Sequence, residues 1–253
     1  MPDRIGSLAN AWTPGDTHVV ESLRDATVER LRLLSDSSNY VFLADLTHPE
    51  HGPGLGVYKP QRGERPLADF EYGTLHRREV AAYELSRLLG WGLVPPTVER
   101  EGPEGLGSMQ LFIEHDPDEH YFALRDREEL REQLLRLAAF DLVANNADRK
   151  GGHLLLDAGG RLWAIDNALC FHRHEKLRTV IWDFAGEELP ERWQLDLRRV
   201  RDCLGEREPS TAALRDRLRE SEVDALVGRL AKLLAHPVLP EMYPWRCVPW
   251  PVI

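Results

Sequence analysis

Residues 141–172 read DLVANNADRKGGHLLLDAGGRLWAIDNALCFH, and this stretch decides the fold that the sequence predicts. The segment Leu130 to Val143 has apolar residues at helical spacing over a wide face, so we expect a helix that ends near Asn145 or Asn146. Two short apolar runs follow, and Asp157-Ala158-Gly159-Gly160 between them is typical of a hairpin turn. The stretch therefore predicts a helix, a polar loop, a hairpin and a final Asp.

The polar loop and the end of the hairpin carry the side chains that phosphoryl transfer uses. That reaction needs a carboxylate near the attacking hydroxyl, a cation on the migrating phosphate and ligands for Mg²⁺. We expect Asp148 to accept or orient the hydroxyl proton and Lys150 to neutralise charge on the phosphoryl group. Asp166, eighteen residues after Asp148, is expected to hold Mg²⁺ together with His153. A His after Gly-Gly is also compatible with an ordinary turn residue.

Two motifs carry a resemblance to a known family: Asp148-Arg149-Lys150-Gly151-Gly152-His153 and Ile165-Asp166-Asn167-Ala168. They resemble the catalytic core of the phosphatidylinositol 3-/4-kinase-like branch of the protein-kinase fold, whose loop reads Asp-Arg-His-x-x-Asn, followed by a hairpin and Ile-Asp-Phe-Gly. The chain is similar to the small bacterial relatives of those kinases, including the HipA-like group. The resemblance implies an α+β, two-lobed protein-kinase-like fold with ATP and Mg²⁺ as cofactors. It places a small antiparallel β-rich lobe at about residues 20–115 and a mainly helical lobe at about 116–253, in a single domain spanning 1–253.

Three positions depart from the pattern of the lipid kinases. Lys150 stands where they carry His, His153 where they carry a metal-binding Asn, and Asn167-Ala168 where they carry Phe-Gly. Asp-x-Lys is closer to the protein-kinase loop, so the expected acceptor is a protein side chain or a small polar metabolite rather than a lipid. Two alternatives stay open: a nucleotide-binding pseudokinase that acts as an interaction module, and a kinase-fold enzyme that transfers AMP.

The beginning of the chain predicts the phosphate-binding part of the small lobe. Residues 27–34 are ambiguous between helix and strand, but the turn composition of 35–39 and the β-rich run 40–46 favour a strand, a tight loop and a second strand. In the kinase fold this loop lies over the ATP phosphates. Ser37 and Ser38 are the candidate phosphate donors, with an ordinary Ser/Asn turn as the alternative.

A lysine and a carboxylate of the kinase pattern follow. Lys59 ends the predicted strand 56–60 at the position of the kinase lysine that pairs with the α/β-phosphates. The predicted helix 70–90 supplies the carboxylate that holds this lysine. We select Glu79 for its Arg-Glu-Val-Ala-Ala context, with Glu84 as the alternative.

The next predicted hairpin leads to the adenine site and to the large lobe. Its strands are 94–100 and 108–114, and the hinge that reads the adenine edge falls at the end of the second strand. The candidate adenine contacts are Gln110, Leu111, Phe112 and Ile113. After the catalytic stretch, the basic segment 173–178 is placed to meet an acidic or phosphorylated acceptor. Two amphipathic helices, 195–204 and 211–234, and a Pro/Trp-rich tail complete the chain.

Composition limits the possible partners and the cellular location. A formal net charge of −10 argues against a general nucleic-acid binder. No run of about 18 apolar residues occurs, so we expect no stable membrane insertion. The three widely separated cysteines favour a reducing compartment over a disulfide scaffold, and the prediction is a cytoplasmic bacterial protein.

Overall fold

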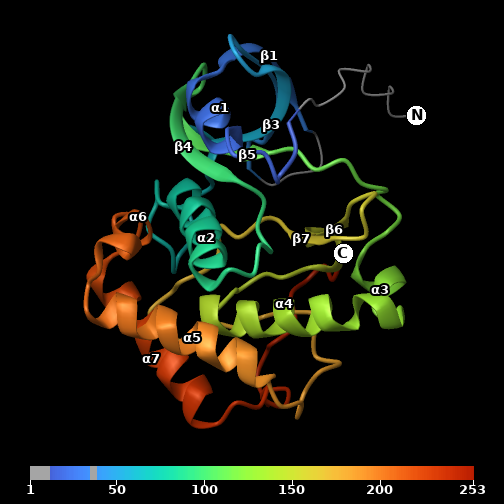
Figure 1. The fold of residues 1–253 in the computed structure, drawn as a ribbon, viewed down its shortest axis with the longest axis vertical. Coiled ribbons are helices and arrows are strands. Elements are labelled where there is room, and N and C mark those ends of the chain that lie inside the picture. Colours follow the sequence, from blue (N-terminus) through green and yellow to red (C-terminus); the bar gives the residue numbers. More distant parts are fainter. Residues whose placement is uncertain (1–11, 35–38) are drawn as a thin grey trace. The chain divides into compact units, whose positions relative to one another are not determined.

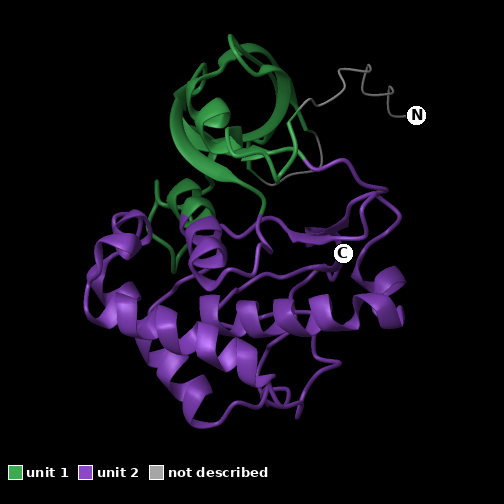
Figure 2. Ribbon diagram, viewed as in Figure 1, with its two compact units in different colours: residues 1–80, 95–112 green, residues 81–94, 113–253 purple. Residues whose placement is uncertain are grey.

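The computed structural model describes residues 12–34 and 39–253, which divide into two compact units (Figure 2). Unit 1 contains the described residues of Met1–Val80 together with Pro95–Phe112. Unit 2 contains Ala81–Val94 and Ile113–Ile253. The chain crosses between the units three times, the first time within helix α2 (Leu75–Leu89). The extent of a single domain over 1–253 stays a prediction.

Among its described residues, unit 1 is built on one antiparallel sheet of five strands in the order β1-β2-β3-β5-β4 (Figure 1). Helix α1 (Val19–Asp25) lies within the curve of this sheet and packs against three of the strands. The α+β prediction, with a small antiparallel sheet before the main helices, is confirmed. The strands are β1 Thr27–Leu33, β2 Phe42–His48, β3 Gly52–Pro60, β4 Thr97–Gly102 and β5 Gly105–Leu111.

The ambiguous segment near the start of the chain is a strand. β1 pairs antiparallel with β2, with Leu33 opposite Phe42 at the end nearest the connecting loop. The predicted order of strand, loop and strand is therefore confirmed. The candidate phosphate donors Ser37 and Ser38 lie outside the described residues, and their role stays a prediction.

Helix α2 begins five residues later than the sequence pattern predicts, at Leu75 rather than at residue 70. Gly73 has a φ of +80°, a left-handed conformation that interrupts a helix. The Glu64 carboxylate accepts from the N–H groups of Gly73 at 2.8 Å and His76 at 3.0 Å, so it satisfies donors at the helix start. Gly90, at φ +72°, ends the helix as predicted.

Unit 2 is mainly helical and contains the two-stranded hairpin β6–β7. Helix α7 packs against both α4 and α5, and buried Leu, Val and Trp side chains fill the core between them. The helices and strands are α3 Tyr121–Leu124, α4 Arg131–Ala144, β6 Leu154–Leu156, β7 Leu162–Ala164, α5 Glu191–Gly205, α6 Ala212–Arg215 and α7 Glu220–Ala235. Single 3₁₀ turns occur at Gln61–Gly63, Glu128–Leu130, Gly151–His153 and Pro209–Thr211.

The prediction of one helix over 211–234 is wrong. The structure has the short helix α6 and then the longer helix α7, separated by 216–219. The Glu222 carboxylate accepts from the Arg219 N–H at 3.0 Å, which caps a new helix start. The sequence pattern does not reveal this break, because the apolar residues on both sides of 216–219 keep a helical spacing and Glu222 is also compatible with a helix interior.

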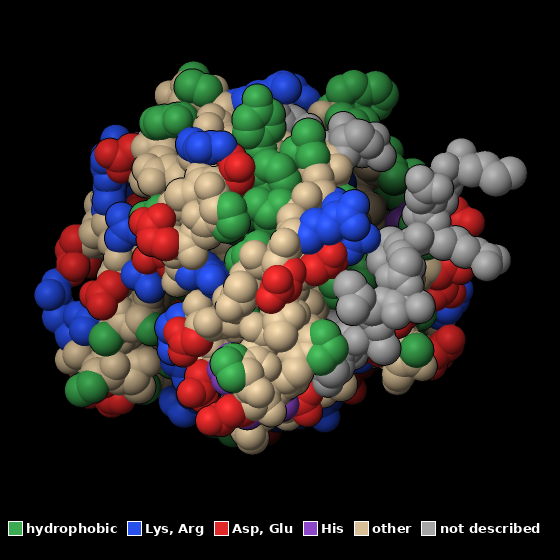
Figure 3. All heavy atoms as spheres, turned by 90° about the horizontal axis from the view of Figure 1, so that it is seen from above, with side chains coloured by type: hydrophobic (Ala, Val, Ile, Leu, Met, Phe, Trp, Pro, Cys, Tyr) green, Lys and Arg blue, Asp and Glu red, His purple; other side chains and the backbone are tan. Residues whose placement is uncertain are grey.

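Charge is mixed on the surface that Figure 3 shows. Acidic and basic side chains alternate there with hydrophobic ones, so the net charge of −10 is not concentrated on that face. Within the part of the chain that the structure describes, no helix has the length and apolar character needed to cross a bilayer.

Candidate active site

The lysine of β3 and a carboxylate of α2 form an ion pair within unit 1. Lys59 lies opposite Ser108 of β5, and its Nζ contacts Glu79 Oε1. The Glu79 side chain is 2% exposed and that of Lys59 is 20% exposed, so the pair is largely withdrawn from water. Glu84, the alternative partner, instead bonds Arg87 at 2.8 Å. The structure thus places Glu79 against the lysine and fixes the ammonium at the end of β3.

A second buried pair fixes the start of the same helix. His76, one turn before Glu79, has its Nδ1 3.0 Å from Glu64 Oε1 and its Nε2 3.3 Å from Glu99 of β4. Burial opposes ionisation of Glu64, but the bonds from the side chain and backbone of His76 outweigh it and lower the pKa of this carboxyl. Sequence reasoning missed this contact, because a Glu and a His on separate segments carry no local pattern.

The predicted catalytic loop follows directly from the end of α4. Asn145 terminates the helix in the left-handed conformation at φ 55°, which Asn tolerates better than most residues. The next residue, Asn146, accepts from the Asp148 N–H at 2.9 Å and donates to Asp141 Oδ1 at 3.2 Å. The backbone of Asp148 is therefore tied to the buried face of α4.

Arg149 organises the loop from inside the protein. Its side chain is fully buried, and its Nε donates to Asp141 Oδ2 at 3.0 Å. Nη1 donates to the Ile165 carbonyl at 2.6 Å, and Nη2 donates to Asn167 Oδ1 at 2.6 Å. One guanidinium thereby joins the residue after Asp148 to the two residues that flank Asp166.

Sequence reasoning missed the role of Arg149, since arginines are seldom fully buried. The available signal was Asp141, an acidic residue on the apolar face of a helix eight positions earlier. A buried carboxylate requires a partner, and the loop that follows the helix supplies two basic residues, Arg149 and Lys150. The same network explains Asn167, which departs from the kinase pattern because its amide holds Arg149.

Asp148 and Lys150 lie together at the surface of the loop. Lys150 Nζ is 3.4 Å from Asp148 Oδ2. Burial raises the pKa of the Asp148 carboxyl, the charge of Lys150 opposes this, and the charge of Asp166 adds to it. Arg178 also lies close enough to stabilise the carboxylate. Arg178 is held against the loop, since its carbonyl accepts from the Arg149 N–H at 2.9 Å.

His153 and Asp166 also meet. His153 Nε2 is 3.3 Å from Asp166 Oδ2, and Nδ1 accepts from the Lys150 N–H at 3.4 Å. An Nδ1 that accepts leaves the ring proton on Nε2, so His153 donates toward Asp166 in this tautomer. Asp166 has a φ of 54°, so the backbone has left the extended conformation two residues after the end of β7. His153 Nε2 therefore faces the Asp166 carboxylate, and the metal-binding role of His153 stays a prediction.

The donor set fits a magnesium ion that is shared with phosphates. Among the described residues, no group of three or more His, Cys, Asp and Glu side chains gathers in a way that would hold an ion. Mg²⁺ in nucleotide sites is commonly held by one or two carboxylates together with phosphate oxygens and waters. Asp166 supplies one such carboxylate, and His153 Nε2 lies 3.3 Å from it, so the residues present provide part of a site that phosphate oxygens and waters would complete.

Two of the candidate adenine contacts use their backbone N–H groups in hydrogen bonds within unit 1. Leu111 N–H donates to the Pro96 carbonyl at 2.8 Å, and Phe112 N–H donates to the Leu55 carbonyl at 3.0 Å. The buried side chain of Gln110 donates to Thr97 Oγ1 at 2.9 Å. Ile113, 5% exposed, is the first residue of unit 2 after the sheet. The adenine-binding role of these four residues stays a prediction.

The fold defines a class: this is a protein with a kinase-like fold. It resembles the Golgi casein kinase with Mn/ADP bound, with a TM-score of 0.55 and 14% identity over 90% of this chain and 79% of that chain. It also resembles hydra Fam20 with sugar, with a TM-score of 0.52 and 16% identity over 86% of each chain. No family model matches the sequence.

The chain belongs to the family of Protein Rv2133c of Mycobacterium tuberculosis (strain ATCC 25618 / H37Rv). The two sequences are 36% identical over 277 residues, which cover 93% of this chain and 95% of that protein.

Proposed function

We propose that this chain is an ATP- and Mg²⁺-dependent phosphotransferase. The observation that carries the proposal is the buried Arg149 network, which ties the loop of Asp148 to the segment that bears Asp166. A fully buried guanidinium is costly unless every bond is made, so the network supports a need to hold two carboxylates in fixed positions. The ion pair of Lys59 and Glu79 in unit 1 supports the same function.

The proposed roles follow from the chemistry of each side chain. Asp148, with its raised pKa, accepts the proton of the acceptor hydroxyl, and Lys150 beside it neutralises charge on the phosphoryl group. Lys59 binds the nucleotide phosphates while Glu79 keeps its ammonium in place. Asp166 holds the metal, which when bound neutralises charge on the phosphate oxygens.

The cofactors have a precedent on this fold. The Golgi casein kinase was solved with Mn/ADP bound, which supports a nucleotide and a divalent cation as the ligands of this chain. The narrower likeness to the phosphatidylinositol 3-/4-kinase-like branch rests on the loop residues alone. We propose a protein side chain or a small polar metabolite as the acceptor, because Asp148-x-Lys150 follows the protein-kinase loop. The three free cysteines support a reducing, cytoplasmic location.

Thermal unfolding with ATP, with and without MgCl₂, tests the nucleotide site. Binding to the folded state raises the midpoint by mass action. We expect a shift that requires Mg²⁺ in the wild type and in the exposed control Asp126→Asn, and a lost shift in Asp166→Asn and Lys59→Ala. An unchanged wild-type midpoint at saturating ATP and MgCl₂ would sink the proposal.

Transfer from γ-labelled ATP to a panel of hydroxyl-bearing peptides and polar metabolites tests the chemistry. Asp148→Asn is expected to keep the ATP-dependent shift and to lose transfer, because the base acts on the acceptor and not on the nucleotide. Binding without any transfer by the wild type would instead favour a pseudokinase. An acceptor that gains the mass of AMP rather than of a phosphoryl group would favour AMP transfer.

A further inference from the structure

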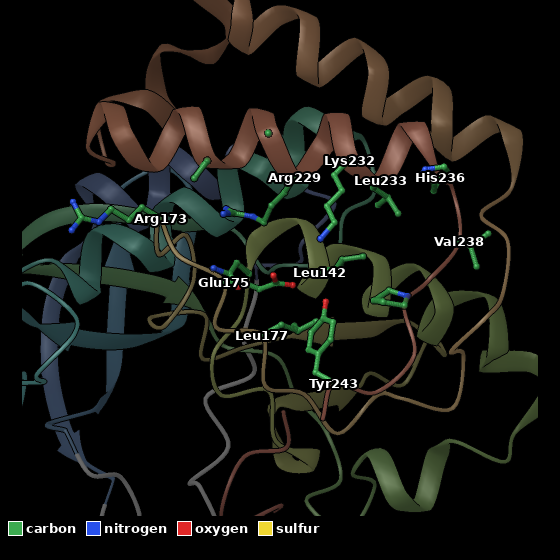
Figure 4. A pocket seen from close by; sticks show the side chains of 14 residues that line it. Leu142, Arg173, Glu175, Leu177, Arg229, Lys232, Leu233, His236, Val238 and Tyr243 are labelled. Atoms are coloured by element: carbon green, nitrogen blue, oxygen red, sulfur yellow. The ribbon is translucent and has the colours of Figure 1, made fainter. Parts of the chain in front are cut away.

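Unit 2 contains a cavity of about 390 Å³ that the proposed phosphotransfer does not use. It lies along helix α7, and its other walls come from the end of α4 and from 173–177 and 238–243 (Figure 4). Its volume falls in the range of about 300–1,000 Å³ that small-molecule sites occupy. The cavity is therefore large enough for a ligand of modest size.

A half-buried arginine of α7 lines this cavity with an incomplete set of hydrogen bonds. Arg229 Nε donates to the Val143 carbonyl at 2.7 Å, and Nη1 donates to the His172 carbonyl at 3.3 Å. Nη2 is buried and has no hydrogen-bond partner among the described residues. Burial lowers the pKa of Arg229 to about 10, although the charges of Glu175 and Glu222 oppose this shift. An anion in the cavity would supply a further countercharge to this guanidinium.

The charges around the cavity favour an anion. The described residues that line it carry three cationic side chains, Arg173, Arg229 and Lys232, and one carboxylate, Glu175. This is the reverse of the chain as a whole, which has a net charge of −10. Figure 4 shows Lys232 directed from α7 toward Leu142 and Glu175. Glu175 already accepts from the Tyr243 hydroxyl, which together with burial raises the pKa of Tyr243.

The rest of the lining is apolar. Leu142, Leu177 and Leu233 contribute side chains from three separate segments. A second cavity, of only about 20 Å³, shares Leu142 and Leu177 with it and is also lined by Ile181. A hydrocarbon body in the larger cavity would bury apolar surface against the three leucines.

We propose that this cavity binds a small organic anion, a carboxylate on an apolar body, with the carboxylate at Arg229 and Lys232. The apolar body then lies along Leu142, Leu177 and Leu233. A carboxylate suits the exposed ammonium of Lys232, from which it gains a charge-assisted hydrogen bond, and it supplies a countercharge to the neighbouring guanidinium of Arg229. This site is separate from the proposed phosphotransfer and does not depend on it.

Calorimetric titration of the full-length chain with sodium decanoate tests the site. Decylamine and decanol serve as matched ligands with a cationic and a neutral head, and decyl phosphate tests the alternative anion. We expect saturable binding of decanoate and at least tenfold weaker binding of decylamine and decanol. No saturable binding of decanoate, or equal binding of decylamine or decanol, would overturn the proposal. Tighter binding of decyl phosphate than of decanoate would show that the site prefers a phosphate head group and would overturn the assignment of a carboxylate.

Two variants place the ligand. Lys232→Glu reverses an exposed charge at the cavity and is expected to weaken decanoate binding at least tenfold. Arg198→Glu, a reversal of an exposed charge on α5 outside the lining, is expected to leave binding unchanged. Ala225→Phe fills the cavity from α7 and is expected to abolish binding. Wild-type affinity in both Lys232→Glu and Ala225→Phe would show that decanoate binds elsewhere and would overturn the assignment.

Discussion

Replacing the buried Arg149 by Met is expected to lower the free energy of unfolding of unit 2 by about 3–5 kcal/mol, the range for breaking a buried ion pair from one side. The side chains of Arg149 and Asp141 are both 0% exposed, so the substitution would leave Asp141 buried without its cationic partner. The substitution also removes donors from the Ile165 carbonyl and from Asn167 Oδ1. The Asn146 amide still donates to Asp141 at 3.2 Å, which limits the loss. A domain stability of about 5–15 kcal/mol leaves the variant folded.

Urea unfolding followed by tryptophan fluorescence measures this loss, because all seven tryptophans except Trp12 lie in unit 2. Arg192→Met is the matched control: Arg192 pairs with Glu132 at 2.8 Å with its side chain 62% exposed, and its loss should cost about 0–1 kcal/mol. The double variant Asp141→Leu/Arg149→Met should be more stable than the sum of the single variants predicts, by about 2–3 kcal/mol. Equal costs for Arg149→Met and Arg192→Met, or strictly additive single variants, would refute the buried network.

Three further perturbations test other contacts. Lys150→Gln removes the charge that opposes the rise in the pKa of Asp148, so the Asp148 carboxyl should take up its proton at a higher pH than in the wild type. Carbon NMR titration of the carboxyl measures this pKa, and an unchanged or lower value in the variant contradicts the prediction. Asn145→Gly keeps the left-handed helix end but loses three side-chain hydrogen bonds, so it should lower the free energy of unfolding by about 2–3 kcal/mol. Asn145→Ala should cost about 1 kcal/mol more, because Ala is strained in the left-handed conformation. A larger free energy of unfolding in urea for the Ala variant than for the Gly variant would argue against strain at this position. Glu64→Gln should be less stable than the wild type at neutral pH, because the bonds from His76 lower the pKa of Glu64 and so stabilise the folded protein when this carboxyl is ionised. The difference in free energy of unfolding between the two proteins should shrink as the pH falls below the ordinary pKa of Glu. A difference that grows on acidification would contradict the lowered pKa.

The sequence by itself determined the local elements and the order of the chemical groups. Apolar periodicity located α4, and turn composition located the β6–β7 hairpin, because both depend on residues close together in the chain. The resemblance of the motifs around Asp148 and Asp166 to those of kinases implied a kinase-like fold, which the likeness to solved structures confirms.

Only the tertiary structure decided which side chains meet. Glu79 and Glu84 both lie on the predicted helix, and the position of β3 relative to that helix selects Glu79 for Lys59. The burial of Arg149 and the bond from His153 toward Asp166 likewise depend on segments that fold back on one another. Local propensity cannot fix these contacts, because their energies arise from burial and pairing across the fold rather than from neighbours in the chain.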